Sequence, residues 1–369
     1  MIIKNVQVFK EDKTFEQGDI IIEDGIFKET ASNNDEVIDG EGCYAIPGLV
    51  DVHFHGCVGH DFCDGSEEAI REIAKYELSQ GITTMVPATM TLSEDELMKI
   101  SKAAGEYKSE EGAVLAGINM EGPFISPAKK GAQAATHIVS PNIEMFRRLQ
   151  NAANGLFRLV DIAPEEEGAM EFIKELKDEV HISFAHTMSD YDTAKKGYDL
   201  GADHATHLYN AMPPFTHRAP GVIGAAHDSK HVMVELIADG VHIHPSVVRT
   251  TFDMFGDDRV VLISDSMRAT GLEDGEYTLG GQAVKVRGNV ATLVEGGALA
   301  GSVTNLMDCV RVAVQKMNVP LESAIAAATI NPAKSVGLDD KYGSIKPGKV
   351  GNVVLLNKDL SLNKVIMNG

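Results

Sequence analysis

Two histidines, His53 and His55, stand two residues apart at the end of the apolar run 45–52. Side chains of a β-strand alternate between its two faces, so residues two apart project to the same side. If this run is a strand, the two imidazoles can converge on one metal ion. The pair alone is a weak indication, because histidines also occur in protein cores. A metal site therefore needs further ligands elsewhere in the chain.

Acidic residues and histidines recur at the ends of later predicted strands, as Glu121, His186, His207 and Asp265. His186 and His207 could hold a second ion, and the two carboxylate oxygens of Glu121 could bridge it to the first. Paired ions about 3.5–4 Å apart activate a bridging water. Asp265 could take a proton from that water and deliver it to a leaving group. The set predicts a metal-dependent hydrolase.

Each of these residues has an ordinary structural alternative. A single buried histidine can simply be a packed core residue, and Glu121 or Asp265 alone could start a helix or form a salt bridge. Six such residues at the ends of five predicted strands are not explained by these roles. The remaining histidines, apart from two considered below, are assigned to the surface or to packing: His60, His181, His204, His217, His227, His231 and His244.

The elements that must position these residues alternate between apolar, β-rich runs and amphipathic helical stretches. Helix starts are readable between the strands: a helix is expected over 66–80, Ser93 and Glu96 have the spacing of a capping box, and Pro141 suits a first helical position. Eight βα units predict an α/β fold of the (β/α)8 TIM-barrel type, whose chemistry lies at the C-terminal ends of its strands. The expected strands are 45–55, 82–88, 113–121, 156–163, 181–186, 203–207, 231–238 and 260–265.

The two ends of the chain differ from the barrel units. Residues 1–46 and 346–369 read as short strands and turns, and we expect them to form one small β-sandwich domain. The barrel domain is then 47–345. A segment rich in glycine and valine, 275–300, is predicted to be a β-hairpin inserted near the last barrel strand.

Composition narrows the range of partners. The chain has 369 residues and a net charge of −21, which disfavours nucleic acid and anionic membranes. No stretch approaches the roughly 18 apolar residues that a membrane helix needs. The first residues show no secretory signal, and the four cysteines lack Cys-x-x-Cys spacing, so we expect a cytoplasmic protein with reduced thiols. An anionic substrate would need a local cluster of cations.

Three longer segments carry a resemblance to a known family. They are 120–124, 207–212 and 237–242. Together with the histidine pair and Asp265, they resemble the amidohydrolase superfamily and, within it, the deacetylases of amino-sugar phosphates. The resemblance runs the whole length of the chain. It implies hydrolysis of the acetamide of a phosphorylated N-acetyl amino sugar, and leaves the gluco and galacto configurations open.

The resemblance also implies a metal-ligand set. Glu121, His186 and His207 match the ligands found throughout that family. His53 and His55 match the additional ligands of members that carry a second ion. One or two divalent ions per subunit are therefore expected, and mixed histidine and carboxylate ligation suits zinc, iron, manganese or cobalt. Asp265 matches the catalytic aspartate.

Other positions match residues around the substrate, here a phosphorylated amino sugar. Arg218 and His242 are expected to come from the neighbouring subunit, which implies a homodimer. Gln133 stands where some members have a histidine that contacts the sugar, and His137 could compensate for that difference. The full set of expected substrate residues is Gln133, His137, Asn210, Ala211, Arg218 and His242.

Two other functions remain open. Another amidohydrolase reaction, such as opening of a cyclic amide or deamination of a base, would use the same barrel, but many such enzymes bridge their ions with a carbamylated lysine where we assign Glu121. A non-catalytic assembly protein on this barrel is the second alternative. Relatives of that kind lose ligands, whereas all six candidate residues are present here.

Overall fold

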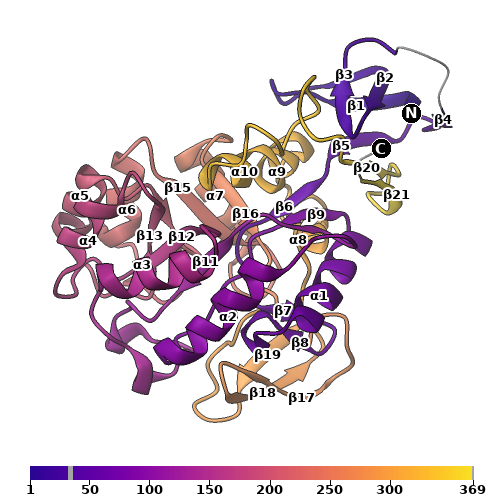
Figure 1. Ribbon diagram of the computed structural model, residues 1–369. Helices are drawn as coiled ribbons and strands as arrows, with labels where there is room; N and C mark the ends of the chain where they lie inside the picture. The colour runs from indigo at the N-terminus through magenta and orange to yellow at the C-terminus, as the bar shows by residue number, and fades with distance from the viewer. Residues whose placement is uncertain (32–35, 368–369) are drawn as a thin grey trace.

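The computed structural model describes residues 1–31 and 36–367. One β-sheet unites strands from the two ends of the chain (Figure 1). Its order is β21-β20-β5-β1-β2-β3, with β4 paired to β1. The strands are β1 (Ile2–Phe9), β2 (Phe15–Glu23), β3 (Ile26–Lys28), β4 (Val37–Asp39), β5 (Tyr44–Pro47), β20 (Val353–Leu356) and β21 (Leu362–Ile366).

A β unit made from both chain ends was expected, but the sandwich prediction was wrong in form. The described residues build one mixed sheet of seven strands. Ile20 and Ile22 of β2 are buried in the core of this sheet with Val353 and Leu355 of β20, as the alternation of side chains in strands requires. Positions 32–35 and 368–369 of the predicted unit lie outside the described residues, and its exact limits stay a prediction.

A curled parallel sheet forms the larger part of the molecule (Figure 1). Strands β11 to β16 pair in sequence order, and β10, β9 and β6 form a second ladder that an isolated bridge between Ala88 and Asn119 connects to the first. The strands are β6 (Leu49–Asp51), β9 (Ile82–Met85), β10 (Val114–Leu115), β11 (Ile118–Glu121), β12 (Phe157–Ile162), β13 (His181–Phe184), β14 (His204–Ala205), β15 (Met233–Ile237) and β16 (Val260–Ile263).

All eight expected strand runs contain strand, but each strand is shorter than predicted. Two runs are divided: 45–55 into β5 and β6, and 113–121 into β10 and β11. No ladder among the described residues joins β16 back to β6. Beyond the two strand ends the backbones still meet, since Asp265 N donates to His53 O at 2.9 Å and His55 N donates to Ser266 O at 2.7 Å. The parallel α/β architecture is thus confirmed, and full barrel closure is not.

Ten α-helices connect and cover the described strands. Two predicted helix starts are confirmed: Ser66 caps α1 by accepting from Ala69 N, and Ser93 with Glu96 forms a reciprocal capping box on α2. The helices are α1 (Glu67–Ser79), α2 (Glu94–Glu106), α3 (Ile143–Ala152), α4 (Ala169–Leu176), α5 (Tyr191–Leu200), α6 (Gly221–Asp228), α7 (Pro245–Phe255), α8 (Leu306–Gln315), α9 (Leu321–Ala328) and α10 (Ile330–Ser335). None of these helices has the length and apolar character needed to cross a membrane.

The predicted start of α3 was wrong by two residues. Pro141 is not the first helical residue, because Asn142 is the N-cap and its side chain accepts a hydrogen bond of 2.9 Å from Met145 N. An asparagine side chain satisfies a free backbone donor at the helix start, a role that the proline at 141 cannot fill.

Packed phenylalanines support the strand ends from outside the sheet. Phe124, three residues after the end of β11, stacks edge-on against Phe172 of α4 with ring centroids 5.4 Å apart. Phe172 in turn contacts Phe146 of α3 at 5.9 Å. All three are fully buried, and each such side chain stabilises the fold by about 1.5–3 kcal/mol. The cluster fixes the segment that follows Glu121.

The inserted segment is larger than the predicted hairpin. It forms a three-stranded antiparallel sheet of β17 (Gly275–Leu279), β18 (Gln282–Arg287) and β19 (Val290–Leu293). Gly280 and Gly281 make the first turn with φ of 53° and 77°, and a two-residue turn that needs positive φ at both positions favours glycine. The third strand follows because β19 buries Ala291 and Leu293 in the core of this small sheet. A short antiparallel pair, β7 (Gly56–Cys57) and β8 (His60–Asp61), lies nearby (Figure 1).

Candidate active site

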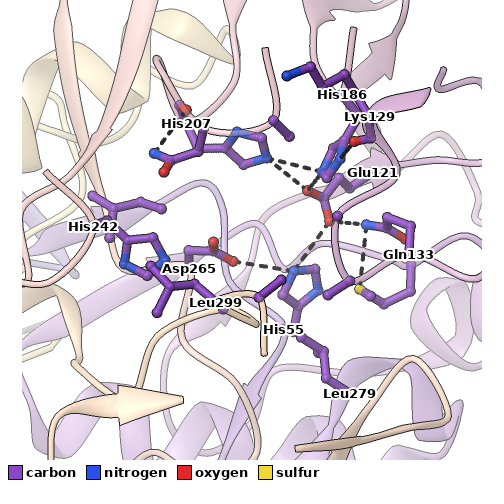
Figure 2. Close-up of a pocket in the computed structure, with 18 of the residues that line it drawn as sticks. His55, Glu121, Lys129, Gln133, His186, His207, His242, Asp265, Leu279 and Leu299 are labelled. Atoms are coloured by element: carbon purple, nitrogen blue, oxygen red, sulfur yellow. Dashed lines mark hydrogen bonds and ion pairs between the residues drawn. The ribbon is translucent and has the colours of Figure 1, made fainter. Parts of the chain in front are cut away.

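The structure brings all six predicted metal and acid–base residues to one end of the parallel sheet. Glu121 is the last residue of β11, and His186, His207 and Asp265 each follow the end of their strands, β13, β14 and β16, by two residues. His53 and His55 follow β6. All six side chains are buried, and Figure 2 shows five of them facing a common centre.

Glu121 lies in the middle of this group. Its Oε1 is 3.0 Å from His186 Nε2 and 3.1 Å from His207 Nε2. The same oxygen is 3.5 Å from His53 Nε2, and Oε2 is 3.3 Å from His55 Nε2. Four imidazoles therefore surround one carboxylate: His53 and His55 follow β6, which precedes it in the chain, and His186 and His207 follow β13 and β14, which come after it.

Nitrogen and oxygen atoms crowd together around this carboxylate. His186 Nε2 and His207 Nε2 are 3.3 Å apart, and His55 Nε2 is 3.4 Å from Asp265 Oδ1. Two triads place one ligand atom per residue within 4.8 Å of one another: His53, Glu121 and His207, and His53, His55 and Asp265. Buried imidazole and carboxylate groups in such clusters are a donor set for a divalent ion.

Three of the site residues have an unusual backbone. His186, His207 and Asp265 have φ of 44°, 28° and 47°, in the left-handed region that side chains with a Cβ rarely enter. Each such residue costs on the order of 1–3 kcal/mol, and strained residues of this kind gather at functional sites. The chain turns at these points, which ends the strands and aims the side chains at Glu121.

Charge around the centre is shared between carboxylates and histidines. Burial acts to raise the pKa of Glu121, but His53 and hydrogen bonds from His186 and His207 hold that pKa well below its usual value. Burial likewise acts to raise the pKa of Asp265, and the contact with His55 lowers it overall. For His55, burial is outweighed by Asp265 and Glu121, which raise its pKa to about 10. The carboxylates keep their negative charge and attract cations.

Glu235 of β15 lies beneath this group and was not predicted from the sequence. Its Oε2 is 3.0 Å from His53 Nδ1 and accepts a hydrogen bond of 3.0 Å from His207 N. Its Oε1 is 3.1 Å from His204 Nε2, so His204 has a polar contact in addition to its packing. The available signal was a charged residue in the middle of the apolar strand run 231–238.

Gln133 lines the site, but both ends of its amide are already engaged. Its Nε2 donates to Glu121 Oε2 at 2.7 Å, and its Oε1 accepts from Thr91 N at 2.7 Å. A direct bond from this amide to a sugar therefore stays a prediction. His137 lies in the short 3-10 helix η3 (Ala135–His137) and is not among the described residues that line the pocket.

A pocket of about 320 Å³ opens onto Glu121, His186 and Asp265, and this volume suits a small molecule. Its walls are mixed. Met90, Ala211, Ile237, Leu279 and Leu299 supply apolar surface, and Lys129 and Asn210 supply polar groups (Figure 2 shows Lys129, Leu279 and Leu299). Leu279 belongs to the inserted sheet, so this sheet forms part of the wall.

His242 and Arg218, expected together in a neighbouring site, lie in different places. His242 lines the pocket of its own chain and bonds Asp239 Oδ2 at 2.7 Å, so its assignment to the neighbouring site was wrong. The cause is the turn after β15, in which Asp239 also accepts from the backbone N of Val241 and His242 and folds the segment inward. Arg218 is exposed and lines a separate surface hollow with Met188 and Tyr191.

Comparison with known proteins agrees with this architecture. The sequence pattern of the Amidohydrolase family matches residues 44–369. The N-acetylglucosamine-6-phosphate deacetylase of Bacillus subtilis (strain 168) is 35% identical over 381 residues, covering 100% of this chain and 96% of that protein. The N-acetylgalactosamine-6-phosphate deacetylase of Escherichia coli O157:H7 is 30% identical, covering 100% of this chain and 98% of that protein.

A solved structure extends the likeness to three dimensions. It is a mutant N-acetyl-D-glucosamine-6-phosphate deacetylase from Mycobacterium smegmatis, in complex with N-acetyl-D-glucosamine-6-phosphate. It superimposes with a TM-score of 0.92 at 29% sequence identity, covering 100% of this chain and 98% of that one. The chain belongs to the amidohydrolase family and, within it, to the N-acetylglucosamine-6-phosphate deacetylases.

Proposed function

We propose that this chain hydrolyses the acetamide of N-acetylglucosamine 6-phosphate to give acetate and glucosamine 6-phosphate. The observation that carries the proposal is the convergence of Glu121, His186 and His207 within 3.3 Å of one another at the floor of a small pocket. The likeness to deacetylases over the full length of the chain supports the choice of substrate.

The donor set fits one or two divalent ions. His53 Nε2 is fully buried and makes no hydrogen bond to the described part of the chain. Buried polar atoms are normally bonded, so this nitrogen has the character of a metal-ligand atom. We propose that His186, His207 and Glu121 hold one ion and that His53, His55 and Glu121 hold the second. Zinc, iron, manganese and cobalt all accept these ligands. A bound ion would polarise the amide carbonyl and lower the pKa of bound water toward about 7.

Asp265 is the proposed acid–base residue. An amide nitrogen is a poor leaving group, so it must gain a proton as the C–N bond breaks. The lowered pKa of Asp265 leaves it ionised and able to accept the proton of the attacking water. Its carboxylate lines the pocket, so it can then pass that proton to the departing nitrogen.

The phosphate of the substrate requires cations in a chain of net charge −21. Lys129 and His242 line the pocket, and burial of His242 is outweighed by Asp239, which raises the pKa of its imidazole. We propose that His242 donates to a substrate oxygen, with Asn210 and Ala211 alongside.

We infer a homodimer in which Arg218 of one subunit reaches the phosphate bound in the other. Arg218 is exposed and lies outside the pocket of its own chain. Met188 and Phe215 are each 48% exposed, and apolar side chains near a cation in this way suit a protein interface. We further expect the protein to be cytoplasmic, with its four free cysteines reduced.

Acetate release from N-acetylglucosamine 6-phosphate tests the proposal, with N-acetylgalactosamine 6-phosphate as the matched comparison. We expect kcat/KM to favour the gluco sugar. The galacto sugar is the second candidate, because a relative named for that activity is 30% identical to this chain. A faster galacto reaction would reverse the assignment. Ring opening of a cyclic amide without acetate release would replace the reaction altogether.

A further inference from the structure

Glu235 is a buried carboxylate that the proposed reaction does not use. It lies at the centre of β15, is 0% exposed, and is not among the described residues that line the pocket above Glu121. Its neighbours along the strand, Val234 and Leu236, are core residues. Burying a carboxylate costs free energy unless its oxygens have polar partners. The three polar contacts of Glu235 therefore indicate its role.

The first contact sets the state of an imidazole. Glu235 Oε2 lies 3.0 Å from His53 Nδ1, and an ionised carboxylate can only accept, so Nδ1 carries a proton. Nε2, which faces Glu121 Oε1 at 3.5 Å, is then the ring nitrogen that can bind an ion. Without this contact the ring could rotate or place its proton on Nε2, and it could then no longer act as a ligand there.

The second contact reaches the other histidine set. The same oxygen, Oε2, accepts a hydrogen bond of 3.0 Å from His207 N, at the left-handed residue that turns the chain after β14. The third contact involves the other oxygen of Glu235, because His204 Nε2 lies 3.1 Å from Oε1. One oxygen atom thus touches both halves of the proposed ligand set.

We propose that Glu235 is a positioning residue that holds His53 and His207 in register, so that both ions can bind. The proposal rests on the proposed function, because it takes His53 to be a ligand of the second ion. Carboxylates behind metal-binding histidines raise affinity by about 10–100-fold. Loss of the contact with Glu235 should therefore lower the affinity for the ion at His53 and His55 first, because Glu235 contacts the His53 imidazole directly.

Three substitutions separate hydrogen bonding from charge. Glu235→Gln removes the charge, but an amide oxygen at the position of Oε2 can still accept from His53 and His207, and its NH2 group can donate to His204. Glu235→Asp keeps the charge and withdraws the oxygens by one methylene. Glu235→Leu removes both. Glu77→Gln is the matched control, because Glu77 is also buried but interacts with Asp51 and Cys57 and with none of the proposed metal ligands.

The measurement is zinc bound per subunit after chelation and reloading, and affinity for Zn²⁺ by chelator competition. We expect Glu235→Gln and the Glu77→Gln control to retain the wild-type ion count. The aspartate and leucine variants should lose the weaker ion, with affinity lower by about 10–100-fold. If Glu235→Leu does not fold, Glu235→Asp alone tests the proposal. If Glu235→Asp keeps both ions and Glu235→Gln loses one, the charge of Glu235 and not its geometry controls binding, and the positioning role is wrong.

His53→Ala separates this inference from the function on which it rests. If the wild type binds two ions, His53→Ala binds one, and both Glu235→Asp and Glu235→Leu still bind two, the positioning role is wrong and the metal site stands. If His53→Ala changes neither ion count nor affinity, the second-ion assignment fails, and the positioning role fails with it.

Discussion

The Nε2 atoms of His186 and His207 lie 3.3 Å apart, and both lie within 3.1 Å of one oxygen of Glu121. Two neutral imidazoles cannot both direct a lone pair into the same small volume without a proton or a cation between them. A divalent ion satisfies both nitrogens and the carboxylate together. This relationship underlies the predictions that concern metal and catalysis.

Asp265→Asn should retain metal and lose turnover. An amide cannot accept and return the proton, so kcat should fall by about 10²–10⁴-fold. Side-chain size is nearly unchanged, and the metal content, measured by inductively coupled plasma mass spectrometry, should match that of the wild type. Activity close to the wild-type value would remove Asp265 from the acid–base role.

His53→Ala should lower the bound metal from two ions per subunit to one. His53 Nε2 is buried, faces Glu121 and belongs to both triads of candidate ligands. The ion held by His186 and His207 should stay, so some activity should survive. Metal content and kcat measured on the same preparation check this. An unchanged ion count would mean that His53 has a purely structural role.

Arg218→Ala should raise KM for the phosphorylated sugar by about one to two orders of magnitude, because a hydrogen bond to a charged group is worth about 1.5–3 kcal/mol. KM for unphosphorylated N-acetylglucosamine should change little. Arg148→Ala, an exposed arginine of α3 paired with Glu94, is the control. Equal losses with both sugars would place Arg218 away from the phosphate.

Glu77→Gln should change how stability depends on pH. Burial in α1 raises the pKa of Glu77 well above its usual value, and the charge of Asp51 raises it further. The folded chain therefore keeps this proton at pH values where the unfolded chain has lost it. The unfolding free energy of the wild type should therefore fall as the pH rises from the ordinary carboxyl pKa toward the pKa of Glu77 in the folded chain.

Urea denaturation between about pH 5 and about pH 8 measures this effect. The difference in unfolding free energy, Glu77→Gln minus wild type, should become more positive as the pH rises. Glu68→Gln provides the control, because Glu68 lies on the exposed face of the same helix. A difference that does not vary with pH would show that Glu77 is ionised in the fold.

Local patterns in the sequence predicted the order of strands and helices and the residues at the strand ends. The His53 and His55 spacing, the Ser93 capping box and the charged strand ends are each readable within a few residues. Glu235 was missed because its role depends on which strands lie side by side. Only the pairing of β14 with β15 brings Glu235 next to His204 and the backbone of His207.

Two other errors have local causes: Asn142, and not Pro141, begins α3, and Asp239 bends the segment that carries His242 back into its own pocket. The third strand of the inserted sheet and the division of 113–121 into β10 and β11 depend instead on which partner strands are available. No window of sequence contains that information.

The left-handed backbone at His186, His207 and Asp265 bears on how this enzyme could evolve. Glycine adopts that conformation freely, and asparagine does so more readily than histidine. Selection for higher thermal stability would therefore favour glycine or asparagine at these three positions, where either replacement removes a group needed for catalysis. Variants selected only for heat resistance should accumulate there as well-folded, inactive proteins, and a thermostable version of this enzyme must gain its rigidity elsewhere.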